Sequence, residues 1–308
     1  MSVLFKTYST YLAKKMREND EANFKNLKHI EGVKSINNIR YFRGKNKYHL
    51  FNMYFPESAS DLSTLPLMIQ IHGGGWIYGD KDLSRFHNAY YASKGMVVLS
   101  MSYRLLLRTN LKGIVQDLFH FFNYIEKHEK ELNISFKNVL LTGDSAGGHL
   151  VLLVNAINQN KDLQELYEVE PFNIKFKMLN LEHPVPFLKE IFNKKGTRIA
   201  NHLLMNAFFG YFYKKKKLYY NSSLEDFIDK SKYPFISIVS SSDDSFKDQT
   251  IKTYEELKKR GNEVCFKMYQ DEPHVFEVSF YDRPKSLDYN NYVINKFKEL
   301  IGNSYEKK

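Results

Sequence analysis

The chain has 308 residues, 43% of them hydrophobic, which is enough to bury one large core or two ordinary ones and argues against a disordered chain. Lysine and arginine outnumber aspartate and glutamate by 45 to 35, a net charge of +10, but most basic residues are scattered singly. The one dense run, residues 214–217, has neither the Gly-rich loop nor the zinc-ligand spacing of common nucleic-acid modules, so we expect no nucleic acid partner.

Cysteine usage and the N-terminus predict the compartment. A single cysteine, Cys265, cannot form an internal disulfide, and residues 1–20 contain no continuous apolar stretch of the signal-peptide type. No segment approaches the roughly 20 apolar residues that span a bilayer. We therefore expect a soluble cytoplasmic protein.

The first 30 residues are predicted to form an amphipathic helix that caps the rest of the chain. Its apolar side would carry Val3, Leu4, Tyr8, Tyr11, Leu12 and Met16. Two polar-alternating segments follow, near residues 34–42 and 48–55, joined by the turn RGKNK. They indicate an antiparallel hairpin at the edge of a sheet.

From about residue 50 onward, short apolar runs alternate with longer helical patterns, which is typical of an α/β protein with a mostly parallel sheet and helices on both faces. The runs are continuous, as expected of strands buried on both sides. The predicted strands are residues 67–71, 96–102, 139–142, 235–240 and 264–269. The predicted helices are residues 111–132, 146–158, 248–260 and 289–301.

Residues 178–232 interrupt this alternation with aromatic, partly helical sequence, and we interpret them as a lid inserted into the domain. No linker, repeat or low-complexity tract divides the chain. The prediction is one domain, residues 1–308, with a cap at 1–30 and a helical lid at 178–232.

A serine stands where one apolar run stops and a helix begins. In residues 143–147, GDSAG, the glycines permit a tight strand-to-helix turn that exposes the central Ser145. The amide groups at the start of the helix favour negative charge nearby. An ordinary Gly/Ser turn is the alternative, but the strand before and the helix after match the context of the G-x-S-x-G motif of serine hydrolases.

Three consecutive glycines follow the strand at 67–71, in residues 72–76, HGGGW. Glycine weakens a strand, so this run favours a loop that brings backbone amides close to another group. Acyl transfer needs such amides to stabilise the oxyanion. A flexible loop is the alternative.

A general base is expected among ten histidines. His274 lies just after the last core strand, at the sheet edge where Ser145 is also expected. His149 is expected to pack locally, and His72 to orient the glycine loop. The remaining histidines lie in helical, cap or surface contexts without carboxylate partners, namely residues 29, 49, 87, 120, 128, 183 and 202.

The acid is expected after the preceding strand, where Asp243 and Asp244 both qualify. The order along the chain is then serine, aspartate, histidine, as in α/β-hydrolases. Four elements in this order, each after its own strand, predict a serine hydrolase.

With HGGGW at 72–76, GDSAGG at 143–148 and YRL at 103–105, the chain resembles the hormone-sensitive-lipase-like carboxylesterases of the α/β-hydrolase superfamily. The resemblance implies Ser145 as nucleophile, His274 as base and then acid, and the amides of Gly74, Gly75 and Ala146 as the oxyanion hole. The family's acid motif, Asp-Pro-Leu-x-Asp, matches a frame that starts at Asp244.

The chain departs from the family at residues 106–108, LLR in place of Ala-Pro-Glu, and at Val275, where glycine is common. The implied reaction is hydrolysis of short to medium acyl esters through an acyl-enzyme, with a small-molecule ester as partner and with no metal or organic cofactor. Deacetylation of sugars and aryl formamide hydrolysis are alternatives on the same residues, and a non-catalytic receptor is disfavoured by His274. A weak membrane-surface contact through Lys214–Lys217 is a further alternative to an ordinary solvated charge run.

Overall fold

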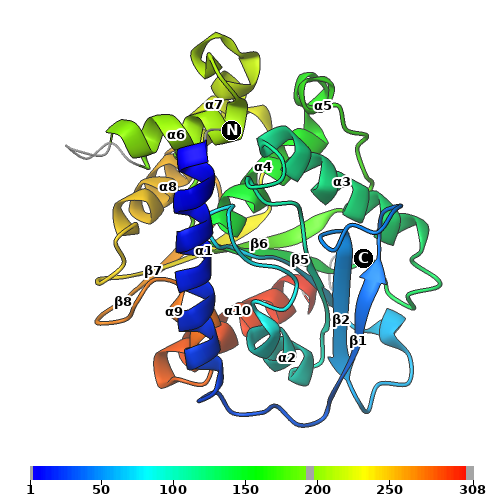
Figure 1. Ribbon diagram of the computed structural model, residues 1–308. Coiled ribbons are helices and arrows are strands. Elements are labelled where there is room, and N and C mark those ends of the chain that lie inside the picture. Colours follow the sequence, from blue (N-terminus) through cyan, green and yellow to red (C-terminus); the bar gives the residue numbers. More distant parts are fainter. Residues whose placement is uncertain (1–2, 192–197, 303–308) are drawn as a thin grey trace.

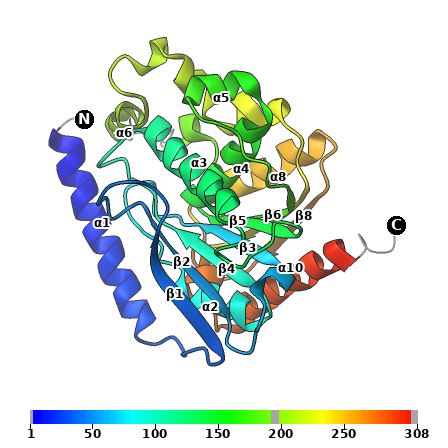
Figure 2. The same ribbon diagram turned by 90° about the vertical axis from the view of Figure 1, so that its right-hand side faces the viewer.

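The computed structural model describes residues 3–191 and 198–302, and it consists of one twisted sheet with helices on both faces (Figures 1 and 2). The strand order is β1-β2-β4-β3-β5-β6-β7-β8, and β3 to β8 run parallel. The strands are β1 Val33–Arg40, β2 Leu50–Pro56, β3 Leu67–Ile71, β4 Val97–Met101, β5 Val139–Asp144, β6 Phe176–Glu182, β7 Phe235–Ser241 and β8 Val264–Tyr269. The predicted α/β class is confirmed, as is the antiparallel edge hairpin, which is formed by β1 and β2.

The helices divide between the two faces of this sheet. The α-helices are α1 Val3–Phe24, α2 Arg85–Ser93, α3 Leu111–Lys127, α4 Ala146–Gln159, α5 Lys161–Tyr167, α6 Arg198–Phe209, α7 Leu224–Phe227, α8 Lys247–Lys259, α9 Phe276–Ser279 and α10 Pro284–Gly302. Short 3-10 helices are η1 Leu62–Thr64, η2 Leu188–Glu190, η3 Tyr213–Lys215, η4 Lys217–Asn221 and η5 Ile228–Lys230. Figure 2 shows α3, α4 and α8 on one side of the sheet and α2 and α10 on the other. Among these described helices, none combines the length and apolarity needed to cross a bilayer.

The side chains of each central strand contribute to two separate hydrophobic cores, one on each face of the sheet. Along β3, Leu67 and Ile69 pack into the core under α3 and α4, whereas Met68 packs into the core under α2 and α10. All three side chains are fully buried, and burial of a side chain of this size contributes roughly 1.5–3 kcal/mol. Burial on both faces explains why the strands appear in the sequence as continuous apolar runs.

The predicted lower boundary of the lid is wrong. Residues 178–182 lie in β6, a fully paired strand between β5 and β7, so the non-sheet segment starts at His183. The strand was missed because its two ends, Phe176-Lys177 and Asn180-Leu181-Glu182, mix polar with apolar residues. The helices α2 and α5 were not predicted either.

The cap and the lid segment meet above the carboxyl ends of the strands. In Figure 1, α1 runs across the front of the molecule, with α6 beside its N-terminal end and α9 beside its C-terminal half. The side chains of Val3 and Leu4, named in the predicted apolar stripe, lie outside the described residues. Tyr11, also named there, is 54% exposed, whereas Leu12 and Met16 pack against the core.

Candidate active site

The turn between β5 and α4 holds Ser145 in a sparsely populated backbone conformation, with φ 50° and ψ −111°. Its amide donates to the carbonyl of Glu182 in the adjacent strand at 2.7 Å, which ties the turn to the sheet. A Cβ on Gly147 would lie 2.0 Å from the carbonyl oxygen of Ile71, and one on Gly143 would lie 2.6 Å from the carbonyl carbon of Gly147. Only glycine fits either position, so the motif residues are required by close backbone packing.

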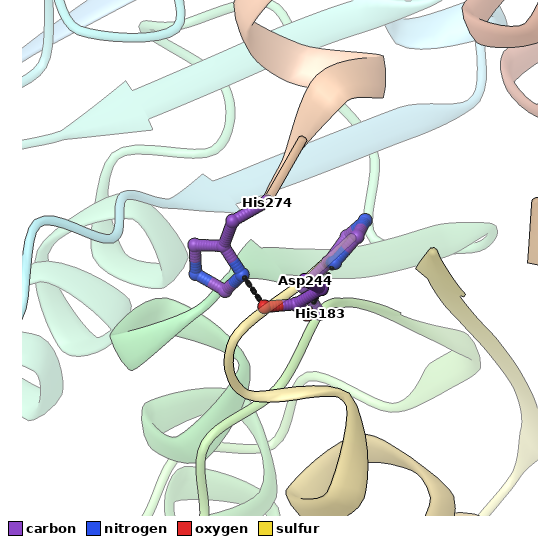
Figure 3. A group of neighbouring side chains, drawn as sticks. All are labelled: His183, Asp244 and His274. Carbon is purple, nitrogen blue, oxygen red and sulfur yellow. Dashed lines mark hydrogen bonds and ion pairs between the residues drawn. The ribbon is translucent and has the colours of Figure 1, made fainter. Parts of the chain in front are cut away.

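His274 and Asp244 form a connected chain with this serine. His274 Nε2 lies 2.9 Å from Ser145 Oγ, and its Nδ1 lies 2.8 Å from Asp244 Oδ1 (Figure 3). Asp244 follows β7 and His274 follows β8, so each side chain comes from its own strand end. Asp243 is exposed, and among the described residues it accepts only from the neighbouring Ser242 hydroxyl at 3.0 Å. The structure therefore brings together Ser145, His274 and Asp244, and leaves Asp243 outside.

The Asp244 carboxylate is 2% exposed, yet it is held in the ionised form. Burial alone would raise its pKa, but hydrogen bonds from His183 and then His274 outweigh burial and hold the pKa of Asp244 well below its ordinary value. The amide of Phe246 also donates to Oδ1 at 2.7 Å. Asp244 thus stays ionised at neutral pH although almost no water reaches it.

His183 and Glu277 are site residues that the sequence interpretation missed. His183 donates from Nδ1 to Asp244 Oδ2 at 2.7 Å, and its Nε2 lies 3.2 Å from Glu277 Oε2. The expectation that His183 lacks carboxylate partners was therefore wrong. Its position directly after the strand β6, at the same sheet edge as the ends of β5, β7 and β8, is the signal that would have found it.

The glycine loop after β3 is anchored to the serine turn through Asp144. The carboxylate of Asp144 accepts from the amide of Gly73 at 3.0 Å and from Gln70 at 3.1 Å, and a Cβ on Gly73 would lie 2.3 Å from Asp144 Oδ2. Burial, followed by repulsion from Glu182, raises the pKa of Asp144 to about 7. This contact fixes the glycine loop relative to the residue that precedes Ser145.

Gly74 and Gly75 extend the loop over the serine with φ of +90° and +59°, values that suit glycine. The carbonyl of Gly74 accepts from the amides of Ile77 and Tyr78 at 3.2 and 3.0 Å, which closes the loop. Within the described part of the chain, the amides of Gly74 and Gly75 donate to no protein acceptor, and both residues line the cavity beside Ser145. Ala146 is the first residue of α4, where an amide has no partner within the helix.

Two other histidines near the loop play the local parts expected of them. His72 stacks on Tyr103 with ring centroids 4.2 Å apart, and burial lowers its pKa to about 4. The Tyr103 hydroxyl donates to the His72 carbonyl at 2.7 Å, so this pair supports the base of the loop. His149 Nε2 contacts the carbonyl of Ser222 at 2.8 Å, and its ring packs edge-to-face against Trp76 at 5.6 Å between centroids.

A cavity of about 380 Å³ opens over Ser145 and His274. One face of α1 forms a wall of it, with a residue at every fourth position: Tyr8, Leu12, Met16, Asp20 and Phe24. Leu203 and Leu204 of α6 and Ile191 contribute from the lid segment, and Phe246, Val275 and Val278 from the sheet edge. Apart from the reacting groups, the lining is mainly apolar, with Asp20 as its one acid on α1.

Val275, beside His274, has φ 53° and ψ 39°, in the left-handed region. A β-branched residue is strained there, by roughly 1–2 kcal/mol. The same conformation explains why glycine is common at this point of the family pattern. The strain lies next to the histidine that contacts Ser145.

The side chains of His183, Asp244 and His274 are also the one group of described residues that could hold a metal ion by proximity, with ligand atoms within 4.8 Å of one another. However, both histidines direct Nδ1 at the carboxylate, and His274 directs Nε2 at the serine. These are the contacts of a proton-bearing imidazole chain, and we assign no metal to them.

Comparisons with known proteins agree with this fold. A family model described as the alpha/beta hydrolase fold matches residues 68–278. The crystal structure of esterase B from Lactobacillus rhamnosis is 26% identical, superposes with a TM-score of 0.92, and is matched over 99% of this chain and 97% of that chain. A structure of the same esterase inhibited by a C4-C4 tributyrin phosphonate superposes with a TM-score of 0.93.

Curated relatives match over shorter stretches. An esterase from Gibberella moniliformis is 25% identical over 144 residues, which is 46% of this chain and 45% of that protein. Kynurenine formamidase from Drosophila melanogaster is 25% identical over 178 residues, which is 51% of this chain and 57% of that protein. The chain thus spans about half the length of these curated relatives.

Proposed function

Because the chain belongs to the hormone-sensitive-lipase-like carboxylesterases of the α/β-hydrolase fold family, we propose that it is a serine carboxylesterase. The observation that carries the proposal is the chain of contacts from Ser145 Oγ through His274 to buried Asp244, at 2.9 and 2.8 Å. This chain opens into a mainly apolar cavity lined by free glycine amides. Ser145 is the nucleophile, His274 the base and then acid, and Asp244 the residue that orients the imidazole.

The reaction proceeds by two acyl transfers. Ser145 Oγ attacks the ester carbonyl carbon while its proton passes to His274 Nε2. The amides of Gly74, Gly75 and Ala146 stabilise the negative charge on the former carbonyl oxygen. The C–O bond to the alcohol breaks, the alcohol leaves with the proton from His274, and water activated by His274 then releases the acid and restores Ser145.

The substrate class follows from the cavity. Its apolar walls suit an acyl chain, and its volume of about 380 Å³ suits a short to medium one. The related esterase B was crystallised with a tributyrin phosphonate, which supports the same class here. We infer that residues 1–30 act as a cap, and that the segment from His183 to residue 232 acts as the lid, because both contribute side chains to the cavity wall.

A panel of p-nitrophenyl esters of graded chain length tests the proposal. We expect the wild type to hydrolyse short and medium chains, and Ser145→Ala to lose kcat by about 10⁴-fold or more. Mass spectrometry should show one phosphonate per chain in the wild type and none in Ser145→Ala. Turnover by Ser145→Ala at the wild-type rate would exclude the mechanism.

Formamide and acetyl-sugar hydrolysis are the alternatives that use the same residues. The partial match to kynurenine formamidase supports the first, whereas the mainly apolar cavity argues against a sugar. N-formylkynurenine and an acetylated xylose in the same panel separate the three activities by kcat/KM.

A weak contact with anionic membranes is an accessory proposal. Tyr211 and Phe212 are 60% and 78% exposed at the turn after α6, next to the exposed run Lys214–Lys217. Aromatic side chains can enter the headgroup region while lysines meet anionic lipid. We expect the protein to co-sediment with phosphatidylserine vesicles and to lose this binding when residues 214–217 are changed to Gln. Vesicle binding that is unchanged in that variant would exclude the membrane contact.

We infer a cytoplasmic location from the single cysteine.

A further inference from the structure

The end of β6 places a second histidine on the acid of the proposed active site. His183 is fully buried, and its ring lies between two carboxylates, Asp244 at 2.7 Å from Nδ1 and Glu277 at 3.2 Å from Nε2. In Figure 3, His274 and His183 approach Asp244 from either side. One oxygen of Asp244 therefore faces each imidazole.

The backbone conformation at His183 and two backbone hydrogen bonds hold this residue in place. Its φ of 51° lies in the left-handed region, which is uncommon for a residue with a side chain. Its amide donates to the carbonyl of Val239 in β7 at 3.0 Å, and the preceding residue, Glu182, accepts from the amide of Ser145 at 2.7 Å. Uncommon backbone conformations persist where surrounding structure fixes them, and they cluster at functional sites.

The two carboxylates that contact the His183 ring favour a proton on it. Glu277 is fully buried, and among the described residues His183 is the one partner within ion-pair distance of its carboxylate. An ionised carboxylate without a partner is strongly disfavoured in a protein interior. Although burial lowers the pKa of His183, Glu277 and Asp244 together outweigh burial and raise it to about 9.

We propose that His183 is a positioning residue: as an imidazolium it bridges Asp244 and Glu277 and fixes the Asp244 carboxylate in the orientation that faces His274. The inference rests on the proposed esterase function. The bridge of two carboxylates and one imidazolium carries a net charge of minus one, which is the charge of Asp244 alone. His274 therefore faces a single net negative charge. The His183 imidazolium, on the other oxygen of Asp244, offsets the free-energy cost of burying that carboxylate.

The groups that face this bridge belong to several elements. Asp244 and Glu277 contact His183 directly, and the ring of His274 lies 5.2 Å from the ring of His183. Behind it, Glu182 pairs with His87 of α2 at 3.3 Å. Burial lowers the pKa of His87, but the nearby carboxylates, Glu182 first, outweigh burial and raise it.

Two substitutions of His183 separate its contact with Asp244 from its contact with Glu277. His183→Asn places an amide near the Nδ1 position and keeps a donor toward Asp244, whereas His183→Gln reaches toward Glu277 and loses that donor. We expect kcat to fall about 100-fold in His183→Gln and about 10-fold in His183→Asn. KM should stay within about twofold, because neither His183 nor Glu277 lines the cavity.

Glu277→Gln keeps the shape but removes the charge that holds the proton on His183. We expect the alkaline limb of the kcat profile, near pH 9 in the wild type, to move by at least about one unit toward neutral pH. His49→Asn is the matched control, because His49 forms another buried imidazole–carboxylate pair, with Asp117 at 3.2 Å, and neither residue lines the cavity. It should change stability without changing kcat or the pH profile.

All rates are normalised to the fraction of chains that a phosphonate labels at Ser145. An unchanged kcat per labelled chain in His183→Gln, or a pH profile of Glu277→Gln equal to that of the wild type, would overturn the proposal. If Ser145→Ala is as active as the wild type, the proposed function fails instead. The bridge is then tested by the protonation state of His183 alone.

That charge is measured without activity. In wild-type protein with ¹⁵N-labelled histidine, we expect an imidazolium at about pH 8 that is lost in Glu277→Gln but kept in His49→Asn. The same signal should shift when the phosphonate occupies Ser145. If no histidine that depends on Glu277 is charged at that pH, the bridge does not exist, whether or not the His183 variants fold.

Discussion

The sheet edge that carries Ser145 and the cap that covers it differ in how tightly their backbones are constrained. At the edge, a Cβ on Gly143, Gly147 or Gly73 would meet backbone or carboxylate atoms within 2.6 Å. In the cap, α1 lines the cavity with side chains at every fourth residue along one face, together with Ser9. Substitutions at the edge should therefore remove the chemistry, whereas substitutions in the cap should change which ester fits.

The largest effect is expected from the acid at the sheet edge. Asp244→Asn should lower kcat by about 10³- to 10⁴-fold, because the amide no longer holds His274 in the required tautomer. The exposed neighbour gives the control, and Asp243→Asn should retain kcat within about twofold. Steady-state hydrolysis of a p-nitrophenyl ester measures both. Equal losses in the two variants would contradict the assignment of Asp244.

A graded pair of glycines tests the steric argument. Gly147→Ala would place a Cβ 2.0 Å from a backbone oxygen, whereas Gly148→Ala meets the Cβ of Pro184 at 2.9 Å. We expect Gly147→Ala to lose about 3 kcal/mol of unfolding free energy, and Gly148→Ala to lose less. Urea denaturation reports the difference, with Gly302→Ala as control because no atom lies within 4 Å of its added Cβ.

The stability of the sheet edge is expected to depend on pH through His183. The pKa of His183 is about 9 when folded and about 6.5 when unfolded, so its contribution is complete below about pH 6.5 and is lost as the pH rises through about 9. We expect a loss on the order of 3 kcal/mol across this window. The loss should be much smaller in Glu277→Gln, as measured by urea unfolding at both ends of the window. A parallel dependence in both proteins would contradict the raised pKa.

The smallest effect is expected in the cap. Met16→Trp fills part of the cavity wall, so KM for the longest accepted acyl chain should rise by about fivefold, while kcat for the shortest ester stays within about twofold. Glu18→Trp, on the exposed side of α1, is the control. A comparable fall in kcat for every ester would mean that the cap also positions the reacting groups.

The sheet and the three-residue chain were predictable because their signals are local. Continuous apolar runs mark the strands, and glycines beside Ser145 mark a turn in which no side chain fits. Position after a strand placed His274 and Asp244 at the same edge. The choice of Asp244 over Asp243 came from a motif frame, since two adjacent carboxylates cannot be separated by spacing alone.

His183 and Glu277 were missed because their relation is not local. They are separated by the lid segment with α6 and α7 and then by β7, α8 and β8, and neither sits in a recognisable motif. The mixed sequence of β6 hid the strand end that would have pointed to His183. The predicted apolar stripe of α1 contained three residues that line the cavity, Tyr8, Leu12 and Met16. It also contained the exposed Tyr11, because the exact face that is covered depends on how the helix docks.

The position of α1 has a consequence for synthesis on the ribosome. Its cavity-facing side chains leave the ribosome before Phe246, Val275 and Val278, which line the same cavity and are translated more than two hundred residues later. We expect α1 to dock after the sheet has closed. Until then, Leu12, Met16 and Phe24 are uncovered on the nascent chain, where exposed apolar surface of this kind favours aggregation or chaperone binding.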